Sequence, residues 1–458
     1  METTYHFAVD LGATSGRTIL ASFNGEKVEM EEISRFRNPM LKIAGHLFWN
    51  LPGLFDEITE GIRKCQKKGI KLNSIGIDTW GCDVAYFYED SSIAGLPYCY
   101  RDRHTSGAVD RVAEIMPRER MYGKTGIQFM DFNTVFQLHT IRRNNPKLIS
   151  NADKILFIPD ALAYMLTGNA VTERTVTSTS QMLDPHTGNL DTEILNAIGI
   201  APDKFGRMVE PGEKIGEYEG IPVIAVAGHD TASAVIAVPS PDKDFAYLSC
   251  GTWSLLGVES EKPVINKKSA DYNFTNEGGL NGSIRLLKNI CGLWLLEQAR
   301  KDFKDAPENI VALSSLCLES KCESIINPDA PDFVNPDSMT EAIRNYCLNS
   351  GQEIPESTAD LVRVIFRSLA KRYATVLDWL KELTDVRINR LHVIGGGSLN
   401  PHLMQMTADE LGIPVVAGPT ESTALGNILV QLMATEDVTD LREIAIKSTE
   451  TRTYKPNK

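Results

Sequence analysis

The sequence lacks the patterns that mark a metal-cluster, membrane or secreted protein. Its eight cysteines include no Cys-x-x-Cys pair, and its eight histidines show no ligand spacing beside them, so no transition-metal site is indicated. We predict that each cysteine is a buried free thiol. No run approaches the length of an uncharged membrane span, and the N-terminal residues show no basic region followed by an apolar one. A cytoplasmic protein is expected.

Positive charge is also scarce, with 47 Lys and Arg against 60 Asp and Glu and a formal net charge of -13. Such a field repels phosphodiester backbones and anionic lipid surfaces, so neither nucleic acid nor a membrane is an expected partner. Any bound nucleotide must be met by local positive or dipolar groups. A chain of 458 residues, 42% hydrophobic and 23% charged, is long enough for two globular domains.

Two common nucleotide motifs are missing. The Gly-x-x-x-x-Gly-Lys-Ser/Thr loop of P-loop proteins does not occur. Gly12 and Gly16 do not fit Gly-x-Gly-x-x-Gly, and they lead into a predicted strand rather than a helix. The sequence therefore disfavours both P-loop enzymes and Rossmann oxidoreductases.

What the chain does contain, twice, is an apolar strand that runs into a turn of glycine and hydroxyl residues, at 7–17 and again at 245–254. A glycine turn brings backbone N–H groups within reach of phosphate, and Asp10 sits where a hydrated Mg²⁺ would bridge to a triphosphate. Two such hairpins facing each other would hold one nucleotide. A plain tight turn remains the alternative for the first, but the recurrence favours two similar halves, 1–241 and 242–458.

A third glycine segment follows the predicted strand 390–394. Gly395, Gly396 and Gly397 precede a predicted helix, so no side chain would obstruct a nucleotide at the helix amino end. We assign Gly396 to contact with ATP. The alternative is that all three glycines serve packing only.

Asp230 is the leading candidate for chemistry. It follows a predicted strand at 222–227 and precedes a helix that begins near Thr231, so it is placed to accept a proton from a substrate hydroxyl. The alternative, a helix N-cap, is equally open on local sequence. His229 could donate to a sugar oxygen or satisfy a buried contact.

The segment after the predicted strand 74–78 is a candidate sugar pocket. Trp80 could form an apolar wall beside Gly81, or it could belong to the core; Phe129 is a second candidate for the wall. Residues 285–303 have amphipathic spacing and are predicted to form a helix, which places Asn289 one turn before Leu293.

Together these segments resemble the FGGY family of carbohydrate kinases, which share the actin-like, ribonuclease H-like ATPase fold. The segments that carry the resemblance are Asp10-Leu-Gly-Ala-Thr-Ser-Gly-Arg17, Gly76-Ile-Asp-Thr-Trp-Gly81, Gly95-Leu-Pro-Tyr-Cys-Tyr-Arg-Asp102, Gly126-Ile-Gln-Phe129, His229-Asp-Thr-Ala-Ser-Ala-Val235, Gly251-Thr-Trp-Ser254, Thr275-Asn-Glu-Gly-Gly279, Leu287-Lys-Asn-Ile290, Gly292-Leu-Trp-Leu-Leu296 and Gly395-Gly-Gly397. The blocks at 78–81 and 292–296 are similar to those of members that act on L-rhamnulose.

The resemblance implies an α/β, two-domain actin-like ATPase fold with the active site in the interdomain cleft. The activity it implies is ATP-dependent phosphorylation of L-rhamnulose at the 1-hydroxyl, with Mg²⁺ as cofactor, in L-rhamnose catabolism. The expected partners are the sugar and ATP, and the expected state is a monomer or homodimer. The alternatives are a related kinase for fuculose, xylulose or glycerol, or an actin-like ATPase that is not a kinase.

The family's functional residues carry over to matching positions of this chain. Asp230 is implied as catalytic base, and Asp10 as a Mg²⁺ residue acting through water. The sugar-binding residues implied are Gly81, His229, Asp230, Thr231 and Asn289, and the ATP-binding residues are Ala13, Thr14, Ser15, Gly16, Arg17, Thr252 and Gly396. One position departs from the family pattern: Glu297 stands where a nucleotide-contacting glutamine is expected, and a carboxylate there would repel phosphate unless it faced the ribose or base.

Overall fold

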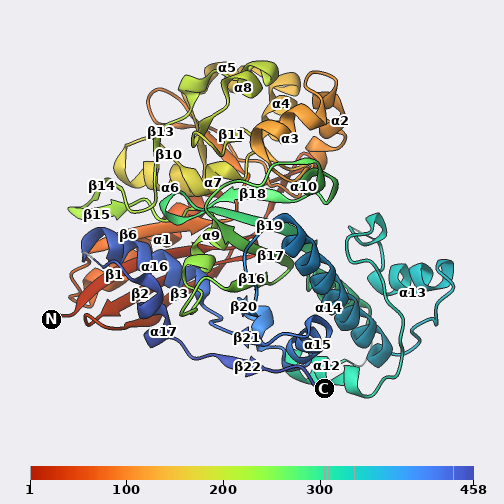
Figure 1. The fold of residues 1–458 in the computed structure, drawn as a ribbon. Helices are drawn as coiled ribbons and strands as arrows, with labels where there is room; N and C mark the ends of the chain where they lie inside the picture. The colour runs from red at the N-terminus through yellow and green to blue at the C-terminus, as the bar shows by residue number, and fades with distance from the viewer. Residues whose placement is uncertain (1, 304–305, 308, 335, 437, 458) are drawn as a thin grey trace. The chain divides into compact units, whose positions relative to one another are not determined.

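The computed structural model describes residues 2–303, 306–307, 309–334, 336–436 and 438–457 (Figure 1). The chain divides into two compact units, each assembled from three segments. Unit 1 consists of Met1–Pro239, Glu259–Leu286 and Thr423–Ser448, and unit 2 of Ser240–Val258, Leu287–Ser422 and Thr449–Lys458. Among the described helices, none has the length and apolar character needed to cross a membrane.

Unit 1 is built on a six-stranded mixed sheet. Its strands, in sheet order, are β14 (Lys214–Tyr218), β15 (Ile221–Ile224), β6 (Ser74–Thr79), β1 (Thr4–Leu11), β2 (Ser15–Phe23) and β3 (Val28–Arg37). The three central strands β15, β6 and β1 are parallel, and the outer strands are antiparallel to their neighbours. Central parallel strands are covered on both faces, which explains why β6 is buried throughout. Their carboxyl ends meet at one edge.

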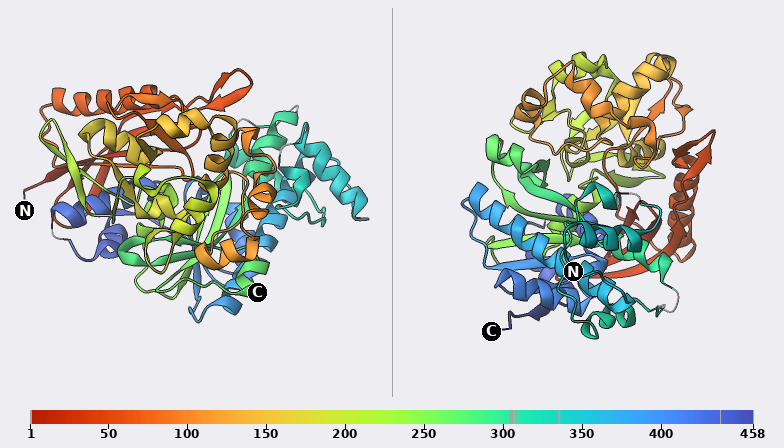
Figure 2. Two further views of the ribbon diagram at one scale, coloured as in Figure 1. Left: turned by 90° about the horizontal axis from the view of Figure 1, so that it is seen from above. Right: turned by 90° about the vertical axis from the view of Figure 1, so that its right-hand side faces the viewer.

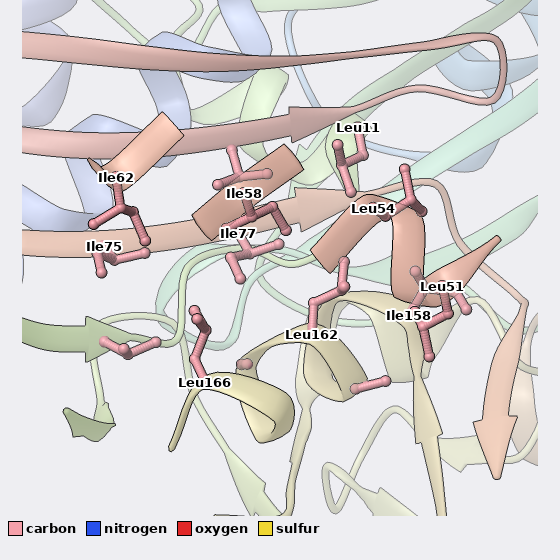
Figure 3. Packing of buried hydrophobic residues seen from close by; sticks show 14 of the residues in the cluster. Leu11, Leu51, Leu54, Ile58, Ile62, Ile75, Ile77, Ile158, Leu162 and Leu166 are labelled. Carbon is pink, nitrogen blue, oxygen red and sulfur yellow. The ribbon is translucent and has the colours of Figure 1, made fainter. Parts of the chain in front are cut away.

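Helices cover both faces of this sheet. One face carries α1 (Leu51–Lys67) and α6 (Ile158–Thr167), and the other α9 (Asp230–Ile236), α16 (Ser422–Thr435) and α17 (Leu441–Ser448). Figure 3 shows Ile58 and Ile62 of α1 packed near Ile75 and Ile77 of β6, with Leu162 of α6 below them. The buried residues of α1 recur every three or four positions, which forms one apolar stripe. This packing fixes the strand ends that carry the candidate site.

The remainder of unit 1 surrounds a second apolar cluster. A small sheet has the order β8 (Ile93–Gly95), β7 (Val84–Phe87), β9 (Lys154–Phe157). The helices α2 (Ala108–Ala113), α3 (Arg118–Thr125), α4 (Thr134–Asn144), α5 (Pro146–Asn151) and α8 (Thr192–Ile198) gather around it (Figure 2, right, orange to yellow-green). Residues 107–170 are mostly helical, with β9 as the exception.

Short elements complete unit 1. They are the strand pairs β4 (Leu41–Ile43) with β5 (His46–Phe48), β10 (Val171–Glu173) with β13 (Arg207–Val209) and β11 (Leu183–Asp184) with β12 (Asn189–Leu190), together with α7 (Arg174–Ser178), α10 (Lys267–Asp271) and β18 (Thr275–Gly278). Single 3₁₀ turns occur at Arg103–Thr105, Pro202–Lys204 and Leu280–Gly282.

Unit 2 is organised around a second mixed sheet. Its strand order is β18, β19 (Ile284–Cys291), β17 (Trp253–Ser260), β16 (Phe245–Cys250), β20 (Arg390–Ile394), β21 (Val415–Ala417) and β22 (Arg452–Tyr454). Along the chain, β18 belongs to unit 1, and β17 and β19 each run across a boundary between the units. The longest helix, α14 (Thr358–Leu383), packs on α15 (Pro401–Leu411). Shorter helices are α11 (Trp294–Ala299), α12 (Ile310–Ser315) and α13 (Met339–Asn349), with 3₁₀ turns at Arg300–Asp302, Leu316–Leu318, Pro331–Phe333 and Gly396–Leu399.

One element prediction is wrong. The segment predicted as a helix over 285–303 begins as strand β19, and only α11 within it is an α-helix. Strand β19 is mostly buried, so its apolar residues fall on both faces and imitate helical spacing. Gly292 ends the strand, where a Cβ would lie 2.6 Å from Ser254 Oγ. Asn289 therefore lies on a strand.

The prediction for cysteine is confirmed: all eight are free thiols. Seven are buried, and Cys291 is half-buried.

Candidate active site

Three polar positions of unit 1 lie together at the carboxyl ends of its parallel strands. Asp10 near the end of β1 is directly opposite Asp78 of β6. The next residue of β6, Thr79, forms a bridge with His229, and its N–H donates to Gly228 O at 2.9 Å. The sheet thus brings Asp10, Asp78 and the loop before Asp230 to one edge, where α/β folds place their ligands.

The first predicted phosphate hairpin is the tight connection between β1 and β2. Gly12 N–H donates to Ser15 O at 2.9 Å, which closes the turn. Asn38 stabilises this turn through two hydrogen bonds: its backbone N–H donates to Thr14 O and its side-chain Nδ2 donates to Gly12 O, both at 3.0 Å. Thr14 is exposed at the tip and Ser15 is half-buried, so their hydroxyls and backbone are open to a ligand.

Gly16 differs from its neighbours in the hairpin. A Cβ there would lie 2.4 Å from the Phe36 ring and 2.6 Å from Leu11 Cδ2. Packing therefore already requires a glycine at this position. Its assignment to ATP contact stays a prediction.

Asp10 and Arg17 form an ion pair at the base of the hairpin. Arg17 Nη2 donates to Asp10 Oδ2 at 2.5 Å, and both side chains are largely buried. A guanidinium held beside the turn supplies the local positive charge that a net acidic protein needs to bind a polyphosphate.

Asp78 is a candidate that reasoning from the sequence missed. Its side chain is fully buried, Oδ2 accepts from Asn427 Nδ2 at 2.6 Å, and Oδ1 has no partner among the described residues. Burial, followed by the negative charges of Asp10 and Asp230, raises the pKa of Asp78 well above its usual value, although the Asn427 hydrogen bond opposes this. The signal that could have found it is a second acid at the end of a strand parallel to β1.

Asp230 is the first residue of α9, and the N-cap position belongs to His229. Its Oδ1 accepts from the backbone N–H and the hydroxyl of Thr231, at 2.6 and 3.2 Å. The side chain remains 32% exposed, so the carboxylate is reachable from solvent. The alternative that Asp230 is the helix N-cap is therefore wrong, because Asp230 lies one position after the N-cap.

The backbone just before Asp230 is held by buried groups from β10 and α7. Gly228 N–H donates to Glu173 Oε2 at 3.0 Å, and His229 N–H donates to Thr175 Oγ1 at 3.3 Å. Glu173 also accepts from the Thr175 and Val176 N–H groups. These contacts fix the direction in which α9 leaves the sheet, and nothing in the local sequence of Glu173 indicates this role.

Trp80 belongs to the core rather than to an open pocket wall. It is 5% exposed, its ring lies 4.2 Å from that of Trp49, and its Nε1 donates to Asp83 Oδ2 at 2.9 Å. Asp83 also accepts from Trp49, Gln137 and the Tyr100 N–H. This buried network anchors the loop that contains Gly81.

Gly81 lies against the end of α7. A Cβ at this position would come within 2.8 Å of Thr179 Oγ1, an atom that accepts from Cys82 N–H at 3.0 Å and donates to Val176 O at 2.7 Å. The contact with Thr179 therefore already requires a glycine at this position. A larger residue would displace Thr179 and the loop that precedes Cys82.

We expect Gly81→Val to raise KM for the sugar more than KM for ATP, because the displaced loop contains a residue assigned to the sugar, whereas the residues assigned to ATP lie on the β1–β2 hairpin. Initial-rate kinetics with each substrate varied in turn measure both constants. Gly123→Val is the matched control, since a Cβ at Gly123 meets nothing within 4 Å. If only KM for ATP rose, the residues assigned to the sugar and to ATP would have to be exchanged.

The second predicted hairpin, in unit 2, connects β16 and β17. Gly251 N–H donates to Trp253 O at 2.8 Å, and the start of α11 supports the turn through Leu293 N–H to Gly251 O and Trp294 N–H to Thr252 O. Thr252 Oγ1 lies 3.2 and 3.4 Å from the two carboxylate oxygens of Glu297. The unexpected glutamate thus accepts the hydroxyl of a residue predicted to contact ATP. Asn289 is half-buried on β19.

The three glycines after β20 have different surroundings. A Cβ at Gly395 would approach Cys250 O at 3.2 Å, and φ of +83° there favours glycine. A Cβ at Gly397 would lie 2.3 Å from Cys250 Sγ. Only Gly396 has nothing within 4 Å of its would-be Cβ. Packing explains the outer two glycines and leaves the middle one open to a ligand.

We therefore expect Gly396→Ala to fold with wild-type stability but to raise KM for ATP several-fold, because its methyl group enters space predicted for nucleotide. Gly397→Ala is the contrasting control and should lower the thermal unfolding temperature. Steady-state kinetics and a thermal melt on both variants make the comparison. A Gly396→Ala enzyme with unchanged KM for ATP would leave that glycine without a nucleotide role.

Sequence models of the FGGY family of carbohydrate kinases match most of the chain, the N-terminal domain at residues 5–237 and the C-terminal domain at residues 246–435. The chain belongs to this family, and it is an ATP-dependent sugar kinase. The family predicted from the motifs is confirmed. The predicted division at 241/242 falls between the two matched stretches and stays a prediction about domains.

Two curated relatives that match nearly the whole chain are rhamnulokinases. The rhamnulokinase of Bacteroides thetaiotaomicron is 50% identical, covering 98% of this chain and 95% of its own. The rhamnulokinase of Mannheimia succiniciproducens is 42% identical, and the match covers 98% of this chain and 94% of that protein.

Solved structures share the fold at low identity. Gluconate kinase from Lactobacillus acidophilus superposes with a TM-score of 0.82 at 18% identity, covering 100% of this chain and 94% of that one. Plasmodium falciparum glycerol kinase with ADP superposes with a TM-score of 0.80 at 16% identity, and the match covers 99% of this chain and 95% of that one. The expected two-domain α/β fold is thereby confirmed.

Proposed function

We propose that this enzyme transfers the γ-phosphoryl group of ATP to the 1-hydroxyl of L-rhamnulose, giving L-rhamnulose 1-phosphate and ADP. The observation that carries the proposal is the 50% identity to a rhamnulokinase over 98% of the chain. L-Rhamnulose is a 6-deoxy ketohexose and has no hydroxyl at carbon 6. The primary alcohol at carbon 1 is therefore its natural acceptor.

Asp230 is proposed as the general base. Its carboxylate is partly exposed and is oriented by the Thr231 N–H and hydroxyl, so it can accept the proton of the 1-hydroxyl as the new P–O bond forms and the bond to ADP breaks. His229 and Thr231 are proposed to contact the sugar beside it, together with Gly81. The half-buried Asn289 of unit 2 is assigned to the sugar by family resemblance.

ATP is proposed to be held by the hairpin of unit 1, through Ala13, Thr14, Ser15, Gly16 and Arg17, and by Thr252 and Gly396 of unit 2. The transferred phosphoryl group passes through a loose transition state, so positioning and charge neutralisation carry most of the catalysis. Arg17 is suited to neutralisation because Asp10 holds its guanidinium at the base of the turn.

Mg²⁺ is the proposed cofactor, and Asp10 would hold it through water. The residues fit this ion, because carboxylate oxygens are the hard ligands that Mg²⁺ takes and Asp10 lies at the base of the predicted phosphate hairpin. Mg²⁺ usually keeps several waters and takes other ligands from phosphates. When bound, it would neutralise charge on the β- and γ-phosphates.

The test is a coupled ADP-release assay on the purified enzyme with L-rhamnulose, L-fuculose, D-xylulose and glycerol. We expect kcat/KM for L-rhamnulose to exceed that for each other acceptor by about tenfold or more. A higher value for another acceptor would name that compound as substrate instead. Slow ATP hydrolysis indifferent to every sugar would indicate an ATPase that is not a kinase. Cytoplasmic location and a monomeric or homodimeric state remain predictions.

A further inference from the structure

A buried charged cluster lies behind His229 in unit 1. Arg285 of β19 is 1% exposed, and its Nη2 lies 3.1 Å from Glu277 Oε2 of β18 and 3.1 Å from His229 Nδ1. Its Nε donates to Gly278 O at 2.9 Å. The elements that carry these residues, β18, β19 and α9, can be followed in Figure 1. None of these contacts was foreseen from the sequence.

The chemistry of the guanidinium decides what the histidine can do. All nitrogens of an arginine side chain donate and none accepts. His229 Nδ1 must therefore present its lone pair to Arg285 Nη2–H, so in the neutral ring the proton is on Nε2. Nε2 lies 3.5 Å from Asp230 Oδ1. The ring then presents an N–H on the side of the proposed catalytic base.

We propose that Arg285 is a positioning residue that fixes His229 as the Nε2–H tautomer, so that the ring donates toward Asp230 or a sugar oxygen beside it. The inference rests on the proposed function for its catalytic consequence, but the tautomer itself does not depend on it. With the other tautomer, Nε2 would present a lone pair toward the Asp230 carboxylate. Two facing acceptors repel, which would move the carboxylate out of position.

Glu277 has a separate part in this arrangement. Burial would raise the pKa of Glu277, but the positive charge of Arg285 and its hydrogen bond lower it, so the carboxylate is ionised. Its negative charge compensates the buried guanidinium, which would otherwise be unpaired. The remaining nitrogen, Arg285 Nη1, is buried without a partner among the described residues.

One competing arrangement has to be set against the proposal. Glu277 Oε2 lies 3.4 Å from His229 Nδ1, and a proton on Nδ1 would be shared with this carboxylate. That arrangement would turn the lone pair away from Arg285 and give the Nδ1–H tautomer. The two arrangements place the imidazole proton on different nitrogens, so they can be told apart directly.

The deciding experiment is ¹⁵N NMR of the full-length enzyme labelled at histidine, with the His229 signals assigned by their loss in His229→Asn. We expect the Nδ1 signal of His229 to be that of an unprotonated nitrogen and Nε2 that of a protonated one. A protonated Nδ1 with an unprotonated Nε2 would overturn the proposal. This result needs no activity, so it stands even if L-rhamnulose proves to be the wrong sugar.

A substitution adds the kinetic consequence. In Arg285→Lys a single ammonium replaces the planar fork, so the Nδ1–H tautomer should become populated and kcat should fall by about 10- to 100-fold, in the range seen when a supporting residue is removed. KM for ATP should not change. Arg363→Lys, a matched change in unit 2 where Arg363 bonds Cys322 O and Glu323, should alter neither the spectrum nor the rates. If Arg285→Lys kept the wild-type kcat and an unchanged His229 spectrum, Arg285 would not be the residue that fixes the tautomer. If Arg285→Lys does not fold, the ¹⁵N spectrum of the wild-type enzyme still shows which ring nitrogen carries the proton.

Discussion

Asp230→Asn is expected to lower kcat by about 10²- to 10⁴-fold while KM for the sugar and KM for ATP stay near wild type. Asparagine keeps an oxygen that can accept from the Thr231 N–H and hydroxyl, so the start of α9 should be undisturbed. What is lost is the group that takes the proton from the sugar. A loss in kcat alone is the signature of an interaction made only in the transition state.

The matched control for Asp230→Asn is Asp203→Asn, which changes an exposed acid in the first turn of another short helix. That variant should keep wild-type kinetics. Thermal melts of both proteins should coincide with the wild-type melt, because neither side chain is buried. Activity of Asp230→Asn within a few-fold of wild type would remove this carboxylate from the chemistry.

The second large effect is expected for Asp10→Asn, with kcat/KM for ATP reduced on the order of 10²- to 10³-fold. A neutral amide holds the water shell of Mg²⁺ less well, and it also releases Arg17 from its ion pair. The concentration of Mg²⁺ needed for half-maximal rate should rise, whereas KM for the sugar should change little. Rates measured across a Mg²⁺ series at fixed ATP report both quantities.

Asp153→Asn serves as the control for Asp10→Asn, because Asp153 pairs with Lys154 away from the strand ends of the site. Its Mg²⁺ dependence should be that of wild type. If Asp10→Asn lost activity with an unchanged Mg²⁺ requirement, Asp10 would act through Arg17 and not through the metal.

Local patterns predicted the parts of the fold that depend on few neighbours. The meander of β1, β2 and β3 follows from alternating and apolar runs around a glycine turn, and α14 follows from a long apolar stripe and a capping box at its N-terminus. The segment at β19 could not be predicted in this way. A strand buried on both faces and an amphipathic helix share the same short apolar spacing, and only the sheet around it decides.

The residues of the candidate site likewise fall into those that local sequence indicates and those that only the folded structure reveals. Residues 13–17 and Asp230 could be proposed from the sequence because their turns and strand ends have recognisable chemistry. Asp78, Glu173 and Arg285 were not, because each acts on a neighbour distant in sequence, and that contact exists only after folding. The assignment of Gly81 to the sugar stays a prediction; the contact with Thr179 that excludes a side chain there is not revealed by local sequence.

A crystal structure of the enzyme with L-rhamnulose and a non-hydrolysable ATP analogue would test the central claim most directly. We expect a carboxylate oxygen of Asp230 to lie about 2.6–3.2 Å from the sugar's 1-hydroxyl, with that hydroxyl facing the γ-phosphate. A complex with both ligands bound in which this carboxylate contacts neither would contradict it.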